Sequence, residues 1–208
     1  MQKRTGAVAA TILALGIAGA AAAGPFEDGA VYYQVGDYQD ALRIWRPMAE
    51  AGYAPAENNL GMMYALGQDL PRDDARAMKW YSRAADQGFA VAQFNLCGLY
   101  AEGQGVARDY AKSADWCRKA AAQGYGAAQD QLGSLYAAGH GVERDPVKAL
   151  MWYDLAVAHF PRPDYEGRAK AANHRDTLAA KLTPAQIAEA QSLAGGWTPQ
   201  IIAPRPED

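Results

Sequence analysis

Residues 98–117 read GLYAEGQGVARDYAKSADWC, and the same pattern recurs 36 positions upstream and 36 positions downstream. The upstream copy, residues 62–81, reads MMYALGQDLPRDDARAMKWY, and the downstream copy, residues 134–153, reads SLYAAGHGVERDPVKALMWY. Self-similarity at a fixed period of roughly 20–50 residues is typical of repeat proteins, in which each repeat is one supersecondary unit. We therefore interpret the chain as an array of similar units stacked one on the next.

The register of the copies is fixed by residues that occupy corresponding positions in all three. They are Leu60, Leu96 and Leu132; Tyr64, Tyr100 and Tyr136; Gly67, Gly103 and Gly139; Arg72, Arg108 and Arg144; Asp73, Asp109 and Asp145; and Trp80, Trp116 and Trp152. Each copy contains two apolar segments at helical spacing, with a glycine-containing turn between them. Each unit is therefore expected to be a helical hairpin.

Small residues mark the places where the two helices of a hairpin are expected to cross. Gly61 and Gly133 stand in the first helix of their units, and Ala77 and Ala149 stand in the second. A glycine inside a helix costs about 1 kcal/mol relative to alanine. Its recurrence after two repeat periods therefore indicates a packing requirement, because neither helix can carry a bulky side chain where the two approach closely.

The helix ends are predicted from the residues around the turns. Asp73, Asp109 and Asp145 each precede a second helix, where an aspartate at the N-cap accepts hydrogen bonds from free backbone N–H groups. We therefore interpret the recurring Arg-Asp pairs as capping devices and not as catalytic groups. Gly88 and Gly124 follow the second helices, where a residue with positive φ is expected.

The pattern LG.MYA.G.GV..DY.KA..W..KAA.QG.A.AQ.NLG resembles the Sel1-like repeat, a relative of the tetratricopeptide repeat with a longer loop inside each hairpin. The resemblance covers residues 56–160. Upstream, AVYYQVGDYQDALRIWRPMAEAGYAPA (residues 30–56) resembles a degenerate first unit with a shortened loop. The resemblance implies an all-α fold, a right-handed α-solenoid of about four helical-hairpin repeats with C-terminal capping helices.

On this interpretation the chain divides into seven segments. They are a signal peptide (1–23), a degenerate repeat (24–55), three Sel1-like repeats (56–91, 92–127 and 128–163), C-terminal capping helices (164–196) and an unstructured tail (197–208).

The N-terminal segment has the layout of a secretory signal peptide. MQKRTG carries Lys3 and Arg4, and the following residues are apolar, uncharged and small up to Ala23. The alternative is a membrane anchor, but the apolar run is short for a stable span of about 20 residues. We expect cleavage after Ala23, export to the periplasm and no stable membrane span.

The charge of the chain argues against nucleic acid as a partner. The formal net charge of −3 becomes about −5 once residues 1–23 are removed, whereas nucleic-acid binding requires basic surfaces. The oligomeric state stays open between a monomer and the stacking of solenoid ends.

The two cysteines are both departures from the repeat. Cys97 stands where the other units have glycine, and Cys117 stands where they have Tyr81 and Tyr153. In an antiparallel hairpin the two positions lie at similar heights on facing surfaces. An exported protein meets an oxidising environment, so we favour a disulfide over the alternative of two buried free thiols.

The sequence contains little that suggests catalysis. His140, His159 and His174 are dispersed, and no metal-binding spacing is present. We therefore expect no metal site, no cofactor and no enzymatic activity. Some cysteine-rich relatives of this repeat family have been linked to β-lactam binding or hydrolysis, but no serine here begins an S-x-x-K motif. A cell-wall-related ligand binder or hydrolase is therefore kept as the alternative function.

A binding surface is expected on the concave face, which in a solenoid is lined by the first helices of the hairpins. Residues opposite the hairpin interior on these helices form what we call the inner strip: Asn58, Met62, Phe94, Glu102, Asp130 and Ser134. The resemblance implies a protein–protein interaction scaffold or regulatory adaptor of the bacterial cell envelope, and we expect another protein or a peptide segment to bind at this strip. The alternative for each residue is an ordinary solvent-facing position, and Phe94 fits that alternative least.

Overall fold

A computed structural model describes residues 24–200, and this part of the chain is helical throughout, without a strand. The signal peptide predicted for residues 1–23 and the last residues, 201–208, lie outside the described residues. The helices are α1 (Pro25–Gln34), α2 (Tyr38–Glu50), α3 (Ala54–Leu66), α4 (Asp74–Asp86), α5 (Ala90–Glu102), α6 (Tyr110–Ala122), α7 (Gly126–Ala138), α8 (Pro146–His159), α9 (Tyr165–Ala179) and α10 (Pro184–Gly195).

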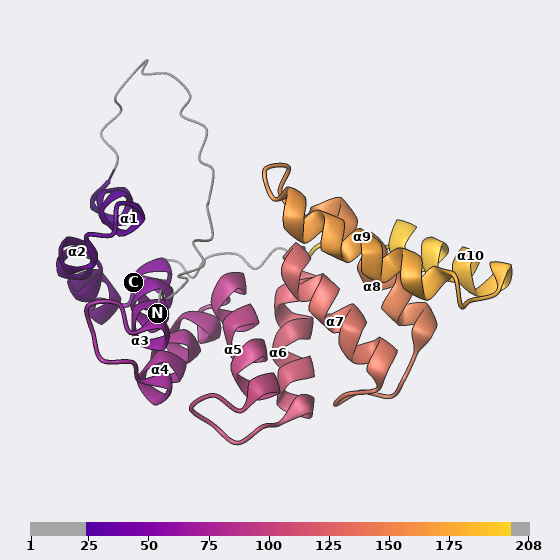
Figure 1. Cartoon of the computed structure of the whole chain (residues 1–208), viewed down its shortest axis with the longest axis horizontal. Coiled ribbons are helices and arrows are strands. Elements are labelled where there is room, and N and C mark those ends of the chain that lie inside the picture. Colours follow the sequence, from indigo (N-terminus) through magenta and orange to yellow (C-terminus); the bar gives the residue numbers. More distant parts are fainter. Residues whose placement is uncertain (1–23, 201–208) are drawn as a thin grey trace, which may run out of the picture.

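The helices pack as consecutive hairpins. α1 packs on α2, α3 on α4, α5 on α6 and α7 on α8, and the second helix of each hairpin packs on the first helix of the next. Figure 1 shows the hairpins following one another along an arc. Both α9 and α10 pack on α8 and close the C-terminal end. The prediction of an all-α solenoid of about four hairpins with C-terminal capping helices is confirmed.

The three aspartates cap the second helices as predicted. The side chains of Asp73, Asp109 and Asp145 accept hydrogen bonds from the backbone N–H three residues later at 2.9, 3.0 and 2.9 Å. The bond donated by the backbone of Lys112 holds the pKa of Asp109 below its usual value. Gly88 and Gly124 also have the expected positive φ, at 89° and 85°.

The helix crossings explain the glycines on the first helices. A Cβ atom on Gly61 would lie 2.9 Å from the ring of Tyr81, and a Cβ atom on Gly133 would lie 2.7 Å from the ring of Tyr153. Carbon atoms in ordinary contact are about 3.5–4.0 Å apart. Each glycine is therefore required by the tyrosine that crosses it, and the prediction that neither helix carries a bulky side chain at the crossing is wrong for the second helix.

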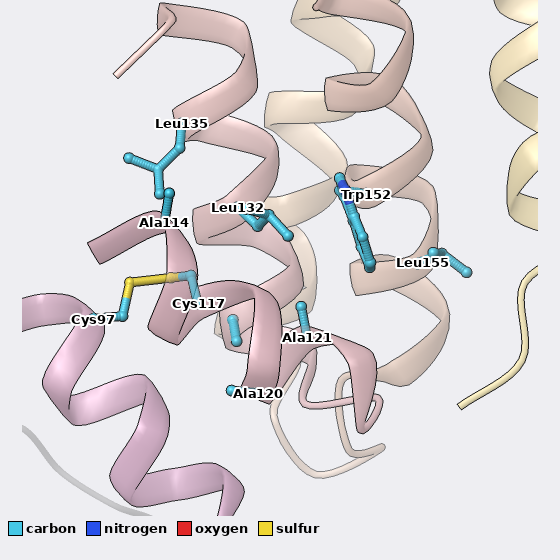
Figure 2. Close-up of a cluster of buried hydrophobic side chains, with 10 residues drawn as sticks. Cys97, Ala114, Cys117, Ala120, Ala121, Leu132, Leu135, Trp152 and Leu155 are labelled. Atoms are coloured by element: carbon cyan, nitrogen blue, oxygen red, sulfur yellow. A yellow bond between two sulfur atoms is a disulfide. The ribbon is translucent and has the colours of Figure 1, made fainter. Parts of the chain in front are cut away.

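Three hairpins carry the 36-residue pattern, and we call α3–α4 the first, α5–α6 the middle and α7–α8 the third hairpin. In the middle hairpin the same two positions hold Cys97 and Cys117, and the structure joins them in a disulfide. Their Cα atoms are 5.2 Å apart and both residues are fully buried. Figure 2 shows the bridge between α5 and α6, beside a cluster of buried side chains that continues to Trp152 and Leu155 of α8. The disulfide thus occupies the space that a glycine and a tyrosine fill in the neighbouring hairpins.

Buried side-chain amides link successive hairpins. Gln93 donates to the carbonyl of Ala85 at 3.2 Å, and Gln129 donates to the carbonyl of Ala121 at 3.1 Å. Both glutamines are almost completely buried. Each carbonyl also accepts the backbone N–H of the glycine that follows its helix, so the glutamine adds a second bond that ties the end of one hairpin to the next.

Glu57 occupies the corresponding place at the first junction and differs chemically. It is 1% exposed, and its Oε2 atom accepts a bond from Gln87 at 2.7 Å. The Nε atom of Arg83 lies 2.7 Å from Oε1, but the pair lacks the alignment of a hydrogen bond. Burial raises the pKa of Glu57, and the charge of Arg83 only partly opposes this effect.

The C-terminal end differs in part from the sequence-based prediction. Thr183 caps α10 with a capping box, followed by Pro184 at the first helical position. Residues 197–200, however, were assigned to an unstructured tail, and the structure packs them against the solenoid. The Trp197 ring lies 5.0 Å from that of His159, and the Gln200 N–H donates to the carbonyl of Ala122 at 2.7 Å.

Candidate functional site

The inner strip lies on α3, α5 and α7, but two of its members are buried and not exposed as expected. Asn58 and Asp130 are each 6% exposed. Asn95 of α5 donates to Asn58 Oδ1 at 2.9 Å, and His174 Nδ1 lies 2.8 Å from Asp130 Oδ1. Helix α5 thus encloses Asn58, and the capping helix α9 encloses Asp130. Asn58 and Asp130 hold helices together, and the prediction that they face solvent is wrong.

Met62 and Ser134 are half-buried and take part in contacts within the protein. The Tyr33 hydroxyl donates to the sulfur of Met62 at 3.8 Å. Ser134 Oγ donates to the carbonyl of Asp130 at 3.1 Å and lies 3.1 Å from the hydroxyl of Tyr153. These two members of the inner strip are therefore only partly available to a partner.

Phe94 and Glu102, the remaining members, lie together on α5 and line a groove of about 320 Å³. We call it the α5 groove. Its walls come from α3, α4, α5, α7 and the loop after α5. The lining residues are Ala65, Tyr81, Phe94, Asn95, Gly98, Leu99, Ala101, Glu102, Gln104 and Gln131.

The α5 groove exists because the middle hairpin lacks two side chains that its neighbours have. Gly98 stands where the flanking hairpins have Met62 and Ser134, and a Cβ atom added to Gly98 would meet nothing within 4 Å. In the third hairpin, Tyr153 extends across Gly133 to Ser134. In the middle hairpin Cys117 replaces that tyrosine, and its side chain is held in the disulfide.

The polar groups of the α5 groove are mostly neutral. Burial raises the pKa of Tyr81, so its hydroxyl stays protonated and is able to donate a hydrogen bond. Asn95 uses its amide NH₂ group toward Asn58, and its carbonyl oxygen remains an acceptor. Glu102 is exposed and is the one charged residue among the described residues that line the groove.

Sequence reasoning missed several lining residues. Tyr81 belongs to a second helix and was assigned to the hairpin interior, although it also borders the groove. Asn95 and Gln131 lie beside the predicted strip and not on it. The signal that was available is Gly98, since the flanking hairpins carry larger side chains at that position.

The histidines do not form a common site. His140 stacks on Tyr110 at 4.7 Å, His159 Nδ1 lies 3.0 Å from Gln129 Oε1, and His174 pairs with Asp130. Within residues 24–200, no three His, Cys, Asp or Glu side chains are grouped as metal ligands would be.

None of the helices between Pro25 and Gly195 is long and apolar enough to cross a membrane.

Comparisons with known proteins agree with the geometry. The family model described as Sel1 repeat matches residues 54–89, 90–125 and 126–159, just over half of the chain. A solved Sel1 repeat protein from Oxalobacter formigenes is 28% identical, with a TM-score of 0.63 over 81% of this chain and 74% of the other. A protective antigen from uropathogenic Escherichia coli strains, displaying an SLR fold, is 29% identical over 82% of this chain and 44% of its own, with a TM-score of 0.48. The comparison with curated proteins gave no match.

Proposed function

Because the chain belongs to the Sel1 repeat family, we propose that it is a protein-interaction scaffold or regulatory adaptor of the bacterial cell envelope. Sel1 repeat proteins are generally scaffolds for protein interactions. The observation that carries the proposal for this chain is the α5 groove, where Phe94 and Glu102 flank Gly98 on an inner helix. The groove offers apolar contact, hydrogen-bonding groups and one charge, which are the features that a bound peptide segment requires.

Export is part of this proposal. The predicted signal peptide precedes the array, and the structure joins Cys97 and Cys117 in a disulfide. Disulfides persist in oxidising compartments such as the periplasm. We expect a mature protein that begins at Gly24 and contains an oxidised pair. Intact-mass measurement of the protein from the periplasmic fraction tests both points, and a full-length, reduced protein in the cytosol would contradict them.

Site-specific crosslinking tests the binding role. A photo-crosslinking amino acid is introduced in place of Ala101, which lines the α5 groove. As a matched control, the same amino acid replaces Lys79, which is exposed on α4. We expect Ala101 to give an adduct with a defined envelope protein that Lys79 does not give. Adding Gly98→Met, which fills the groove, should remove that adduct. The proposal fails if both positions give the same adducts, or if Ala101 gives none.

One observation favours the alternative, a ligand binder or hydrolase acting on cell-wall material. Asp130 is buried and binds Nδ1 of the partly exposed His174 at 2.8 Å, which is how a carboxylate orients a histidine that acts as a base. Ser134 nearby is already engaged with the Asp130 carbonyl and with Tyr153. Hydrolysis of nitrocefin or binding to peptidoglycan, lost in His174→Ala and retained in His140→Ala, would favour this alternative over the scaffold.

A further inference from the structure

The groove-lining residues of α5 are spaced to match an extended peptide. Phe94, Gly98 and Glu102 follow one another at intervals of four residues, so each is about 6 Å from the next along the helix axis. In an extended chain the side chains on one face recur every second residue, at about 6.6 Å. A peptide that runs along α5 therefore places three alternate side chains opposite these three positions.

The middle position is a notch. Gly98 has no side chain, and a Cβ atom added there would still meet nothing within 4 Å. Phe94 stands on one side, and Ala65 of α3 and Ala101 of α5 contribute further apolar surface. An aliphatic side chain that enters the notch removes apolar surface from water on both molecules, and burial of this kind is the main source of affinity in small apolar sites.

The end of the groove next to Glu102 is negatively charged. Glu102 is exposed, and no lysine or arginine is found among the described residues that line the groove. A carboxylate at this position attracts Lys or Arg and disfavours Asp or Glu, since like charges held close together cost free energy. The formal net charge of −3 for the whole chain acts in the same direction at longer range.

Two hydrogen-bonding side chains that line the groove, Tyr81 and Asn95, suit a peptide backbone. The Tyr81 hydroxyl is able to donate to a carbonyl. The corresponding tyrosine of the third hairpin, Tyr153, has its hydroxyl paired with Ser134. In the first hairpin Met62 takes the place of that serine, and the sulfur of Met62 accepts a hydrogen bond from Tyr33. The carbonyl oxygen of Asn95 supplies an acceptor for a peptide N–H.

We propose, on the basis of the protein-binding function proposed above, that the α5 groove binds an extended peptide segment of the pattern aliphatic–x–Lys/Arg. The aliphatic side chain enters the notch at Gly98, and the basic side chain pairs with Glu102. An apolar residue two positions away from the aliphatic residue, on the side opposite the basic one, packs on Phe94. The direction of the peptide along α5 is free, so the mirrored order of the same residues is equally acceptable.

A display selection tests the chemistry of the groove directly. Random twelve-residue peptides are selected on the purified oxidised protein, and the enriched sequences are aligned. We expect enrichment of Lys or Arg two residues from Leu, Ile, Val or Met, in either order. Enrichment of acidic peptides, or of apolar peptides without a basic residue, would overturn the proposed chemistry.

Three variants locate the selected peptides. Gly98→Met introduces the residue of the first hairpin and should weaken binding at least about tenfold, because it fills the notch. Glu102→Lys should shift a repeated selection toward Asp or Glu, and Glu102→Gln should weaken the basic peptides about threefold to fivefold. The control is Lys79→Ala on exposed α4, which should leave the affinity unchanged. Circular dichroism of each variant shows whether it is folded.

The outcomes separate this inference from the broader function. Peptides that are lost in Gly98→Met but show no preference for Lys or Arg would leave the binding role of the groove standing and overturn its chemistry. Selected peptides that bind Gly98→Met as well as the natural protein would place binding elsewhere and overturn both. A concentration-dependent dimer that Gly98→Met abolishes would show that a second copy occupies the groove, and would also overturn the peptide proposal.

Discussion

The middle hairpin (α5–α6) and the third hairpin (α7–α8) share a left-handed glycine after the first helix and an aspartate cap on the second, but they fill their interiors differently. In the third hairpin Tyr153 crosses Gly133 and extends to Ser134 on the inner face. In the middle hairpin a disulfide occupies the crossing, and Gly98 leaves the inner face open. The comparison teaches that a covalent bond in the interior replaces the packing of a large aromatic side chain, and that the surface above it is then free to form a groove.

The largest loss of stability is expected when a tyrosine from one type of helix crossing is combined with a cysteine from the other. Cys117→Tyr in a chain that keeps Cys97 removes the disulfide and places a ring against the Cys97 side chain. The corresponding Cβ atom on Gly133 would lie 2.7 Å from the ring of Tyr153. We expect a loss in the free energy of unfolding of about 4–6 kcal/mol, from about 3 for the disulfide and the rest from overpacking.

The matched variant adds Cys97→Gly, which recreates the glycine–tyrosine crossing of the neighbouring hairpins. Urea unfolding of the two variants should show that the double variant recovers the overpacking part of the loss, about 1–3 kcal/mol. Equal stability of the single and double variants would mean that the two crossings are not interchangeable.

Removing the disulfide without adding bulk should have the next largest effect. The cysteines are separated by 20 residues, and closing a loop of that length stabilises a fold by about 3 kcal/mol in the chain-entropy model. Replacing both Cys97 and Cys117 by Ala should therefore lower the free energy of unfolding by about this amount. A loss below about 1 kcal/mol in urea unfolding would contradict a structural role for the bond.

Two glycine substitutions should change stability in opposite directions. Gly98→Ala adds a methyl group where nothing lies within 4 Å, and alanine is the better helix former, so we expect a gain of about 1 kcal/mol. Gly133→Ala places the same methyl group against Tyr153 and should cost about 1–3 kcal/mol. Thermal unfolding measures both, and a shift of the same sign in the two variants would show that the inner faces of these hairpins do not differ as described.

The smallest effect concerns the junctions between hairpins. Glu57→Gln gives the first junction the side chain that the other two have, and it should raise the free energy of unfolding at neutral pH by up to about 1 kcal/mol. Burial raises the pKa of Glu57 in the folded state. Protonated Glu57 therefore stabilises the fold below the unfolded-state pKa of about 4.3, and this contribution to the free energy of unfolding is lost as the pH rises through the folded-state pKa.

The pH dependence supplies the control for this prediction. The advantage of Glu57→Gln over the natural protein should be small at pH 4 and should grow as the pH rises toward 7. An advantage that is constant across this range, or that shrinks as the pH rises, would mean that the Glu57 charge is not disfavoured by burial.

Much of the fold could be predicted because it depends on local residues that recur at a fixed period. Asp109 marks a helix start, Gly124 marks a helix end, and Gly133 marks a close approach to Ala149, although the ring of Tyr153 at that crossing was not predicted. The pairing of Cys97 with Cys117 followed from the same register. Each of these features is decided within one hairpin, so the repeat pattern contains the information that fixes it.

The candidate site could be predicted only in part, because it depends on distances between hairpins. Asn58 and Asp130 were expected to be exposed, but α5 and the capping helix α9 approach closely enough to bury them. The docking of Trp197 was missed for the same reason, since the aromatic rings that it contacts lie on α8 and not in its own segment. A helical-wheel argument on one helix contains no information about the next hairpin.

The most direct test of a binding site in the middle hairpin is the dissociation constant of the selected peptide for the natural protein and for Gly98→Met, measured by isothermal titration on folded, oxidised samples. Gly98→Met leaves the disulfide in place and fills only the groove. The account predicts binding at least about tenfold weaker in the variant, with unfolding stability equal to or above that of the natural protein. Equal affinity in the two proteins would contradict the account.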